Sequence, residues 1–464
     1  ISITPANFKP AFNYIGKSQF IADPLFNGAI DDVQIADYAL TPAQVAALMT
    51  NTPPTFSADL IDLGEAVPFA PFTTNISAYA TDLNPSDTLT FTKASGPAWI
   101  NISPAGLLSG TPGANNGGMN HITVRVSDAA GANAYATFAV YVPITYGSGT
   151  WIVDADGFWD ESTNWNGGAI PNGGNGINHT ADFSTINITA DGTVRLENAR
   201  SIGTLRFGDI SGAQNWNLTS DGPALTLDAG LSSPSIQVNQ NTATLALPVD
   251  GANGFTKSGA GTLVLAGSNP LKGTVFIDTS LTSGSSGNTR IAHPNALSSV
   301  TNISIRNNNS GTSTLQFDGS QGDVITPASI SLSGRTINSA AIQNLSGSNS
   351  INGGISLGSG GSFYVLQSDS GTLNLGGMLS AGSSATGTRT FTFQGAGNFH
   401  VSGPLVNGSA TNNLTKSGPG NLTLAAANTH SGTNRISGGM LTLAHSGALQ
   451  NSTLTLLNTL LNGS

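Results

Sequence analysis

The sequence predicts an all-β protein in which a β-sandwich is followed by a long parallel β-helix. Three observations support this fold class. Glycine accounts for 58 of the 464 residues, and only 9% of the residues are charged, against about 25% in an average globular domain. Short runs of alternating apolar residues, bounded by Gly, Asn or Pro, recur along most of the chain. Residues 211–464 also repeat internally, which is typical of a solenoid.

Composition and charge exclude several classes of function. The chain has no Cys, so it has no disulfide, no Cys-ligated zinc and no thiol nucleophile. The net charge of −10 and the pI near 4.8 argue against a nucleic-acid partner. No apolar run approaches the roughly 18 residues of a membrane span. Because no signal peptide precedes the patterned segment that starts at Ile1, we expect the chain to be a piece of a longer precursor.

Residues 1–50 predict strands followed by one short helix. Thr41 and Pro42 are typical of a helix start, because Thr caps free amides and Pro is favoured at the first position. Residues 14–16 and 26–33 resemble the C-terminal end of a laminin-G-like (concanavalin-A-like) domain. The resemblance implies that residues 1–50 are the remnant of a jelly roll followed by a helix.

Residues 51–143 predict about seven short strands with turn residues between them, which favours a β-sandwich. Three stretches, residues 80–87, 97–112 and 126–128, resemble the cadherin-like "putative Ig" domains of bacterial surface proteins. The resemblance implies an extracellular spacer or adhesion domain, called here the Ig-like module.

The Ig-like module also contains a candidate calcium site. Asp82, Asp87 and Asp128 supply oxygen ligands of the type that Ca²⁺ prefers. The alternative is that these carboxylates only stabilise turns at strand ends. Calcium is therefore the one cofactor that the sequence suggests.

Residues 144–210 are rich in aromatic residues and are expected to form a cap and the first coils of the solenoid. Trp151, Trp159 and Trp165 stand close together in the sequence. Such a group is either a platform on which sugars stack or a cap over an open hydrophobic end. The first alternative makes these three residues candidate carbohydrate-binding residues.

Residues 211–464 predict the repeats of the β-solenoid. Residues 255–265 match residues 414–424 at an offset of 159, and the match continues without a gap to residues 273 and 432. A second pair, residues 292–297 and 444–449, matches at an offset of 152. Each repeat is a short strand with Gly or Asn at its ends. This pattern suits a parallel β-helix, in which inward apolar side chains stack and Gly and Asn turn the corners.

These repeats resemble the autotransporter-associated β-strand repeat of secreted bacterial passenger domains. The strings Lys257-Ser258-Gly259-Ala260-Gly261 and Lys416-Ser417-Gly418-Pro419-Gly420 carry the resemblance. It extends over roughly residues 150–464 and implies a fold rather than a reaction, because a fold does not fix function.

No catalytic residue is expected from the sequence. The paired carboxylates of a glycosidase, a metal-binding His motif and a nucleophile elbow are not recognised. Lys257 and Lys416 are candidate bases for a β-helix lyase, but they occupy the same position in two repeats. His293 and His445 also occupy equivalent positions. We therefore expect structural roles for all four.

The favoured function is that of a non-enzymatic extracellular protein with a structural or adhesive role, such as a stalk, fibre subunit or matrix component. One alternative is the carbohydrate-binding region of a large polysaccharide-degrading protein, and a second is a β-helix polysaccharide lyase or hydrolase. The expected location is the bacterial surface or the medium. The expected partners are polysaccharides, cell-surface glycans or further copies of the chain.

Overall fold

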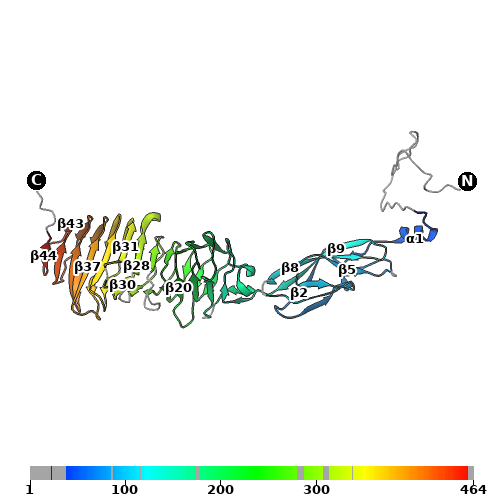
Figure 1. Ribbon diagram of the computed structural model, residues 1–464, viewed down its shortest axis with the longest axis horizontal. Helices are drawn as coiled ribbons and strands as arrows, with labels where there is room; N and C mark the ends of the chain where they lie inside the picture. The colour runs from blue at the N-terminus through cyan, green and yellow to red at the C-terminus, as the bar shows by residue number, and fades with distance from the viewer. Residues whose placement is uncertain are drawn as a thin grey trace. The chain divides into compact units, whose positions relative to one another are not determined.

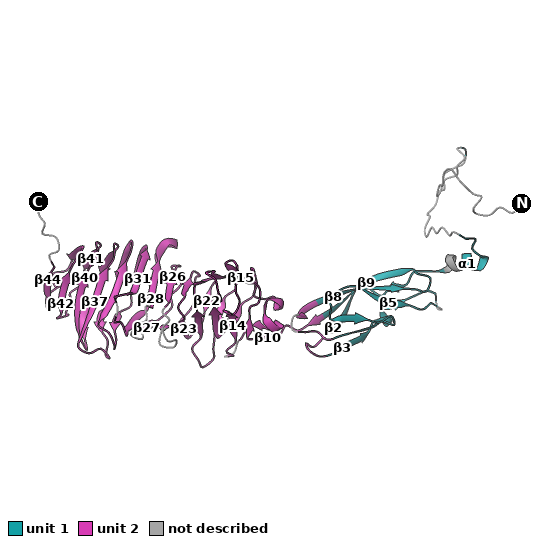
Figure 2. Ribbon diagram, in the orientation of Figure 1, with its two compact units in different colours: residues 1–64, 71–110, 120–140 teal, residues 65–70, 111–119, 141–464 magenta. Residues whose placement is uncertain are grey.

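The computed structural model describes residue 22 and residues 38–84, 87–113, 116–173, 177–278, 287–306, 313–336 and 338–457. These residues are almost all in strands and turns, as expected (Figure 1). Two compact units are distinguished (Figure 2), residues 1–64, 71–110 and 120–140, and residues 65–70, 111–119 and 141–464. The predicted jelly-roll strands lie outside the described residues.

One α-helix, α1 (Pro42–Thr50), starts where the sequence predicts it. Thr41 is its N-cap. The Thr41 hydroxyl accepts a hydrogen bond from the Gln44 amide, and the Gln44 side chain accepts one from the Thr41 amide. This reciprocal pair is a capping box, and it satisfies two amides that the helix leaves free.

The Ig-like module contains nine strands among its described residues. Its sheets have the strand orders β2-β9-β8-β5, β3-β7-β6 and β1-β4. Phe91, Val124 and Phe138 are among its buried core residues. The strands are β1 (Thr55–Phe56), β2 (Leu60–Glu65), β3 (Phe72–Asn75), β4 (Ala80–Thr81), β5 (Thr90–Ser95), β6 (Ile100–Ile102), β7 (Leu107–Gly110), β8 (Gly118–Ser127) and β9 (Asn133–Val142).

The β-solenoid contains two long parallel sheets in its described part. The first has 11 strands. They are β11 (Gly149–Thr150), β14 (Thr180–Phe183), β17 (Thr204–Phe207), β20 (Ser235–Val238), β23 (Gly254–Ser258), β25 (Thr274–Asp278), β27 (Asn302–Arg306), β30 (Ser329–Ser333), β33 (Ile355–Leu357), β36 (Leu379–Ala381) and β39 (Leu405–Gly408).

The second long sheet has 13 strands, and strands spaced by about 4.8 Å extend it over roughly 58 Å. They are β12 (Gly157–Phe158), β15 (Gly192–Leu196), β18 (Trp216–Ser220), β21 (Thr242–Ala246), β24 (Thr262–Leu265), β26 (Asn288–Ile291), β28 (Thr314–Asp318), β31 (Ala340–Ser346), β34 (Phe363–Ser368), β37 (Thr388–Gln394), β40 (Thr411–Lys416), β42 (Thr433–Ile436) and β44 (Thr453–Leu456).

Shorter parallel sheets add a third face to some of the coils. One has six strands, one has three, and β10 (Tyr146–Gly147) pairs with β13 (Ile170–Pro171). The six are β29 (Ile325–Thr326), β32 (Ser348–Ile351), β35 (Thr372–Leu375), β38 (Asn398–Val401), β41 (Asn421–Leu424) and β43 (Met440–Leu443), and the three are β16 (Arg200–Ile202), β19 (Leu225–Leu227) and β22 (Val249–Asp250).

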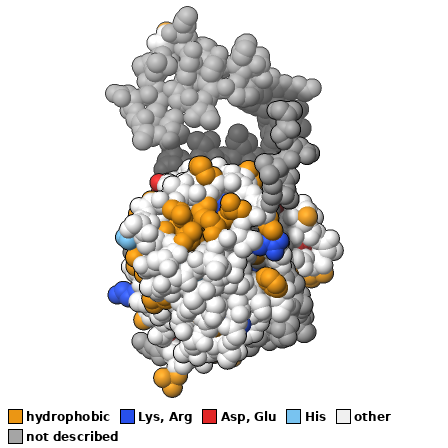
Figure 3. Space-filling view, turned by 90° about the vertical axis from the view of Figure 1, so that its left-hand side faces the viewer, with side chains coloured by type: hydrophobic (Ala, Val, Ile, Leu, Met, Phe, Trp, Pro, Cys, Tyr) orange, Lys and Arg blue, Asp and Glu red, His pale blue; other side chains and the backbone are white. Residues whose placement is uncertain are grey.

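A continuous apolar core runs through the described part of the solenoid. Alternate residues of each strand point inward, so equivalent side chains of successive coils stack. Phe183 of β14, for example, lies opposite Phe207 of β17, and their rings stack 5.3 Å apart at 7°. Leu454 and Leu456 of β44 are exposed at the last strand of the long sheet, and Figure 3 shows hydrophobic side chains gathered on this end. Among the described residues, no helix is long and apolar enough to cross a membrane.

The two predicted repeats form the same kind of coil. Phe255 of β23 pairs with Val275 of β25, and Leu414 of β40 pairs with Asn434 of β42, so each coil is 20 residues long. The first coil joins the 11-stranded sheet to the 13-stranded sheet, whereas the second joins the 13-stranded sheet to the six-stranded sheet. The repeat therefore encodes a corner between two strands rather than one particular face.

Both corners are built around a buried lysine. The Lys257 ammonium donates to the carbonyls of Gly259 and Gly261, at 2.6 Å each. The Lys416 ammonium donates to the carbonyls of Ser417 and Gly418, at 2.8 Å each. These bonds satisfy carbonyls at the turn that the sheet ladders leave free.

Glycine is required in the same two corners. Gly259 has φ +82° and Gly418 has φ +76°, a left-handed conformation that favours Gly. A Cβ on Gly259 would also collide with the Val238 carbonyl of the preceding coil. The close approach of successive turns therefore adds a steric requirement to the conformational one.

One asparagine and one histidine also occupy equivalent positions after later strands of the two repeats. Asn269 and Asn428 are buried, and each bridges two coils, because its side-chain oxygen accepts from Val249 or Leu405 and its amide donates to Ala296 or Ala448. The two histidines make equivalent contacts: Nδ1 of His293 accepts from the Asn295 amide, and Nδ1 of His445 accepts from the Gly447 amide. Each contact joins residues two positions apart and is typical of a turn.

A buried histidine predicts that the solenoid loses stability in acid. Burial lowers the pKa of His430, whose Nε2 lies 2.8 Å from Oδ1 of Asn434. Because the unfolded chain then binds the proton more readily, stability is lost as pH falls below about 6.5, by at most about 1.4 kcal/mol per pH unit. Urea unfolding at about pH 7.5 and about pH 5 measures this loss.

The matched variants are His430→Gln and His400→Gln. His400 is exposed on β38, so its replacement should leave the acid-sensitive loss unchanged. His430→Gln should reduce the loss of stability in acid, whatever this substitution does to stability at neutral pH. An identical pH dependence in all three proteins would contradict the assignment to His430.

Candidate functional site

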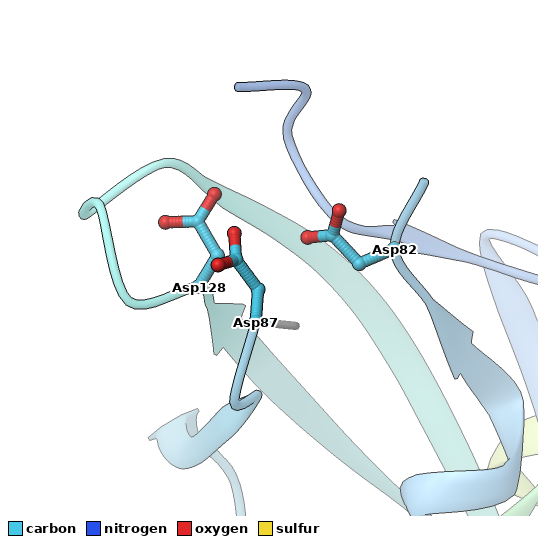
Figure 4. A group of neighbouring side chains, drawn as sticks. All are labelled: Asp82, Asp87 and Asp128. Carbon is cyan, nitrogen blue, oxygen red and sulfur yellow. The ribbon is translucent and has the colours of Figure 1, made fainter. Parts of the chain in front are cut away.

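Three carboxylates meet at one end of the Ig-like module (Figure 4). Asp82 follows β4, Asp87 precedes β5 and Asp128 follows β8. Strand ends bring them together although Asp128 lies far along the chain from the other two. The structure therefore assembles the three residues that the sequence singles out for calcium.

The three side chains are close enough to share one cation. One carboxylate oxygen from each lies within 4.8 Å of the others. Ca²⁺ binds oxygen ligands at about 2.3–2.6 Å, so two oxygens on one ion are separated by at most about 5 Å. Among the described residues, no Lys or Arg forms an ion pair with these carboxylates, since the ion pairs there all lie in the solenoid.

The hydrogen bonds at the cluster leave part of it free for a ligand. Asp128 is 6% exposed, and its two oxygens accept from the Ala132 amide and the Asn51 side chain, at 2.9 and 3.1 Å. Asp82 Oδ1 accepts from the Asn84 amide at 2.8 Å. Asp82 Oδ2 is buried and has no hydrogen-bond partner among the described residues.

This arrangement is chemically suited to a hard cation. A buried carboxylate oxygen without a partner is costly, and close carboxylates repel one another. A divalent cation removes both penalties. Asn51 could add a neutral ligand, because turning its amide would present Oδ1 instead of Nδ2 to the site. Sequence reasoning missed Asn51, which lies at the C-cap of α1 and not in the module's motifs.

The positions of the three tryptophans contradict the predicted sugar-stacking platform. Trp151, Trp159 and Trp165 are each 0% exposed, so they offer no surface on which a sugar could stack. They pack against one another and against Phe183, with ring centroids 5.1–5.7 Å apart. The alternative interpretation, in which they fill the hydrophobic start of the solenoid, agrees with this packing.

The indole nitrogens of the tryptophan cluster are also satisfied internally. Those of Trp151, Trp159 and Trp165 donate to the carbonyls of Val153, Pro171 and Trp159, at 2.7, 2.9 and 2.8 Å. The cluster thus combines a large apolar volume with hydrogen bonds that fix the first coils.

Trp165→Ala is expected to destabilise the solenoid by about 3–5 kcal/mol, because it leaves a large cavity in a close-packed core. Urea unfolding measures the effect. Phe158→Ala is the control, since Phe158 lies on β12 and is 40% exposed. If Trp165 acted as a sugar platform instead, Trp165→Ala would leave stability unchanged.

The candidate bases of a lyase are not at the surface. Lys257 and Lys416 are 1% and 0% exposed, and both ammonium groups are bonded to turn carbonyls. Burial lowers the pKa of Lys257 to about 7 and also lowers that of Lys416. These contacts are those of structural residues.

Comparison with known families identifies two kinds of segment. Residues 53–143 match the family described as "Putative Ig domain". Residues 255–279 and 414–443 match the passenger-associated-transport-repeat, and each segment contains one of the two 20-residue coils described above. No match was found among curated proteins.

Similarities to solved structures include short and distant ones. Two endo-fucoidan hydrolases of glycoside hydrolase family 107 are among them. MfFcnA4 is 20% identical over 27% of this chain and 19% of its own, with a TM-score of 0.20. MfFcnA9 is 23% identical over 24% of this chain and 18% of its own, with a TM-score of 0.18. The chain thus spans less than a fifth of these proteins.

Proposed function

We propose that the chain is part of an extracellular protein with a structural role, in which the solenoid acts as a stiff scaffold. The observation that carries the proposal is the unbroken parallel sheet of 13 strands over a continuous core. Each coil is hydrogen-bonded to its neighbours, so bending the solenoid would break many ladder bonds at once. The passenger repeats fit an extracellular β-helix protein.

Two features support this role over the alternatives. The tryptophans proposed for carbohydrate binding are buried. The lysines proposed as bases for a β-helix lyase or hydrolase are buried and hydrogen-bonded. The residues first considered for these alternatives therefore serve the scaffold.

Electron microscopy of the purified chain and labelling of intact cells test this proposal together. Particles that contain a straight rod of roughly 58 Å, as the strand spacing requires, would support it, and so would ordered filaments. Antibody labelling should occur on intact cells of the source bacterium. Particles without a rod, or labelling only after permeabilisation, would contradict it.

We also propose that the Ig-like module binds Ca²⁺ through Asp82, Asp87 and Asp128. The observation that favours this function is the buried, unpartnered oxygen of Asp82 beside two further carboxylates. The ion would join the ends of three strands and so stiffen the module. The experiment that tests this site opens the Discussion.

A further inference from the structure

An open groove lies on the outer face of the 13-stranded sheet, over β34, β37, β40 and β42. Its volume is about 580 Å³, which is in the range of ligand sites. Most of its lining is hydroxyl and amide groups, with one aromatic and one cationic side chain. The lining side chains used below are Phe363, Thr390, Thr392, Asn413, Thr415 and Arg435, and we call this surface the threonine groove.

The register of the sheet arranges these side chains in columns. Thr390 pairs with Phe363 on one side and Asn413 on the other. Thr415 pairs with Thr392 and with Arg435. Neighbouring strands are about 4.8 Å apart, a step comparable to the length of one sugar unit. The groove thus presents polar groups at a spacing that suits an extended glycan.

Phe363 is exposed for a reason that the register explains. Its neighbour Tyr364 points into the core and is 0% exposed, whereas Phe363 points outward and is 53% exposed. Covering this ring with the apolar face of a ligand would remove apolar surface from water, which is favourable. The apolar face of a pyranose is a suitable cover for such a ring.

The charge of this region favours an anionic ligand. The chain as a whole carries a net charge of −10, but residues 370–464 contain no Asp or Glu. Arg435 is exposed, and it forms no ion pair within the described part of the chain. The lining of the groove contains no Asp or Glu, so an anion there would meet an unpaired guanidinium and no acidic lining residue.

We propose that the threonine groove binds an anionic polysaccharide. Phe363 packs against a sugar ring, Arg435 pairs with a carboxylate or sulfate group, and the Thr and Asn columns hydrogen-bond to hydroxyl groups. This adds a binding partner to the structural role and does not depend on it. A rod could form without binding a glycan, and binding could occur whatever the scaffold does, so the two proposals fail separately.

Affinity gel electrophoresis of the full chain tests the proposal. The probes are polygalacturonate, which is carboxylated, dextran sulfate, which is sulfated, and neutral dextran. Phe363→Ala and Arg435→Gln are the site variants. Phe158→Ala removes an exposed Phe from the far end of the same sheet, and Lys272→Gln removes an exposed cation elsewhere. Thermal unfolding verifies that each variant is folded.

We expect at least one anionic probe to retard the protein, and each site variant to bind it about tenfold more weakly. The two control variants should bind like the parent chain. Retardation by polygalacturonate alone or by dextran sulfate alone identifies the anionic group. The proposal is overturned if no anionic probe binds, if neutral dextran binds equally well, if both site variants bind normally, or if Lys272→Gln weakens binding as much as Arg435→Gln.

Discussion

Calcium is expected to raise the thermal unfolding midpoint of the Ig-like module, and Asp87→Asn is expected to remove most of this rise. The proposed ion would bind only where three strand ends hold the carboxylates together, so it would stabilise the folded state. At a calcium concentration about 100 times the dissociation constant, binding adds about 2.7 kcal/mol. For a module of this size, that corresponds to roughly 10–20 °C. Scanning calorimetry of the full chain, in EGTA and in excess Ca²⁺, measures both values.

Asp87 is the informative position within the cluster. Asp128 also holds its own turn through the Ala132 amide, and Asp82 bonds to the Asn84 amide, so their variants would disturb the turns as well as the site. In EGTA, Asp87→Asn should be more stable than the parent chain, because it relieves repulsion among the three carboxylates. Asp59→Asn is the control, since Asp59 is exposed and outside the cluster. An equal calcium response in Asp87→Asn and the parent chain would contradict the proposed site.

Features that depend on residues close together in the sequence could be predicted from the sequence. The start of α1 follows from Thr41 and Pro42, because capping involves residues of one turn. The structural roles of Lys257 and Lys416 follow from their equivalent places in two repeats. Their closest partners are carbonyls one to four residues away, so the sequence motif contains most of the corner. Lys416 also donates to the more distant Gly438 carbonyl at 3.4 Å.

The tryptophan cluster and the threonine groove depend on which way each side chain points. Composition alone cannot distinguish a buried Trp165 from an exposed one, because both interpretations use the same apolar ring. Likewise, Phe363 and Tyr364 are adjacent aromatic residues, and only the register of β34 with its neighbours exposes the first and buries the second. The absence of acidic residues after Asp369 is a sequence signal in this region, but it does not show which side chains share a face.

The acidic cluster could be predicted only in part. The chemistry of Asp82, Asp87 and Asp128 could be recognised from residue type, but their convergence depends on how β4, β5 and β8 end at the same edge of the module. Asn51 could not be anticipated, because it reaches Asp128 across 77 residues of sequence. Long-range contacts of this kind are set by the packing of the strands.

The buried lysines predict large losses of stability on truncation. Lys257→Ala and Lys416→Ala are each expected to destabilise the solenoid by about 3–5 kcal/mol, because each leaves a cavity and deprives turn carbonyls of their donor. Lys272→Ala is the matched control, since Lys272 is exposed. Urea unfolding measures all three. Losses below about 0.5 kcal/mol, the size expected for surface changes, would show that the corner does not need its lysine.

The pH dependence of stability separates the effect of the Lys257 charge from the effect of its side-chain volume. Burial lowers the pKa of Lys257 from 10.5 to about 7, so between these values the unfolded chain binds the proton and the folded chain does not. Stability should therefore rise with pH across this interval, by up to about 5 kcal/mol. Lys257→Met keeps the apolar stem but cannot titrate, so the difference between the parent chain and this variant gives the contribution of the ammonium group. If both proteins show the same rise, other groups cause it, and Lys257 keeps its proton in the folded corner.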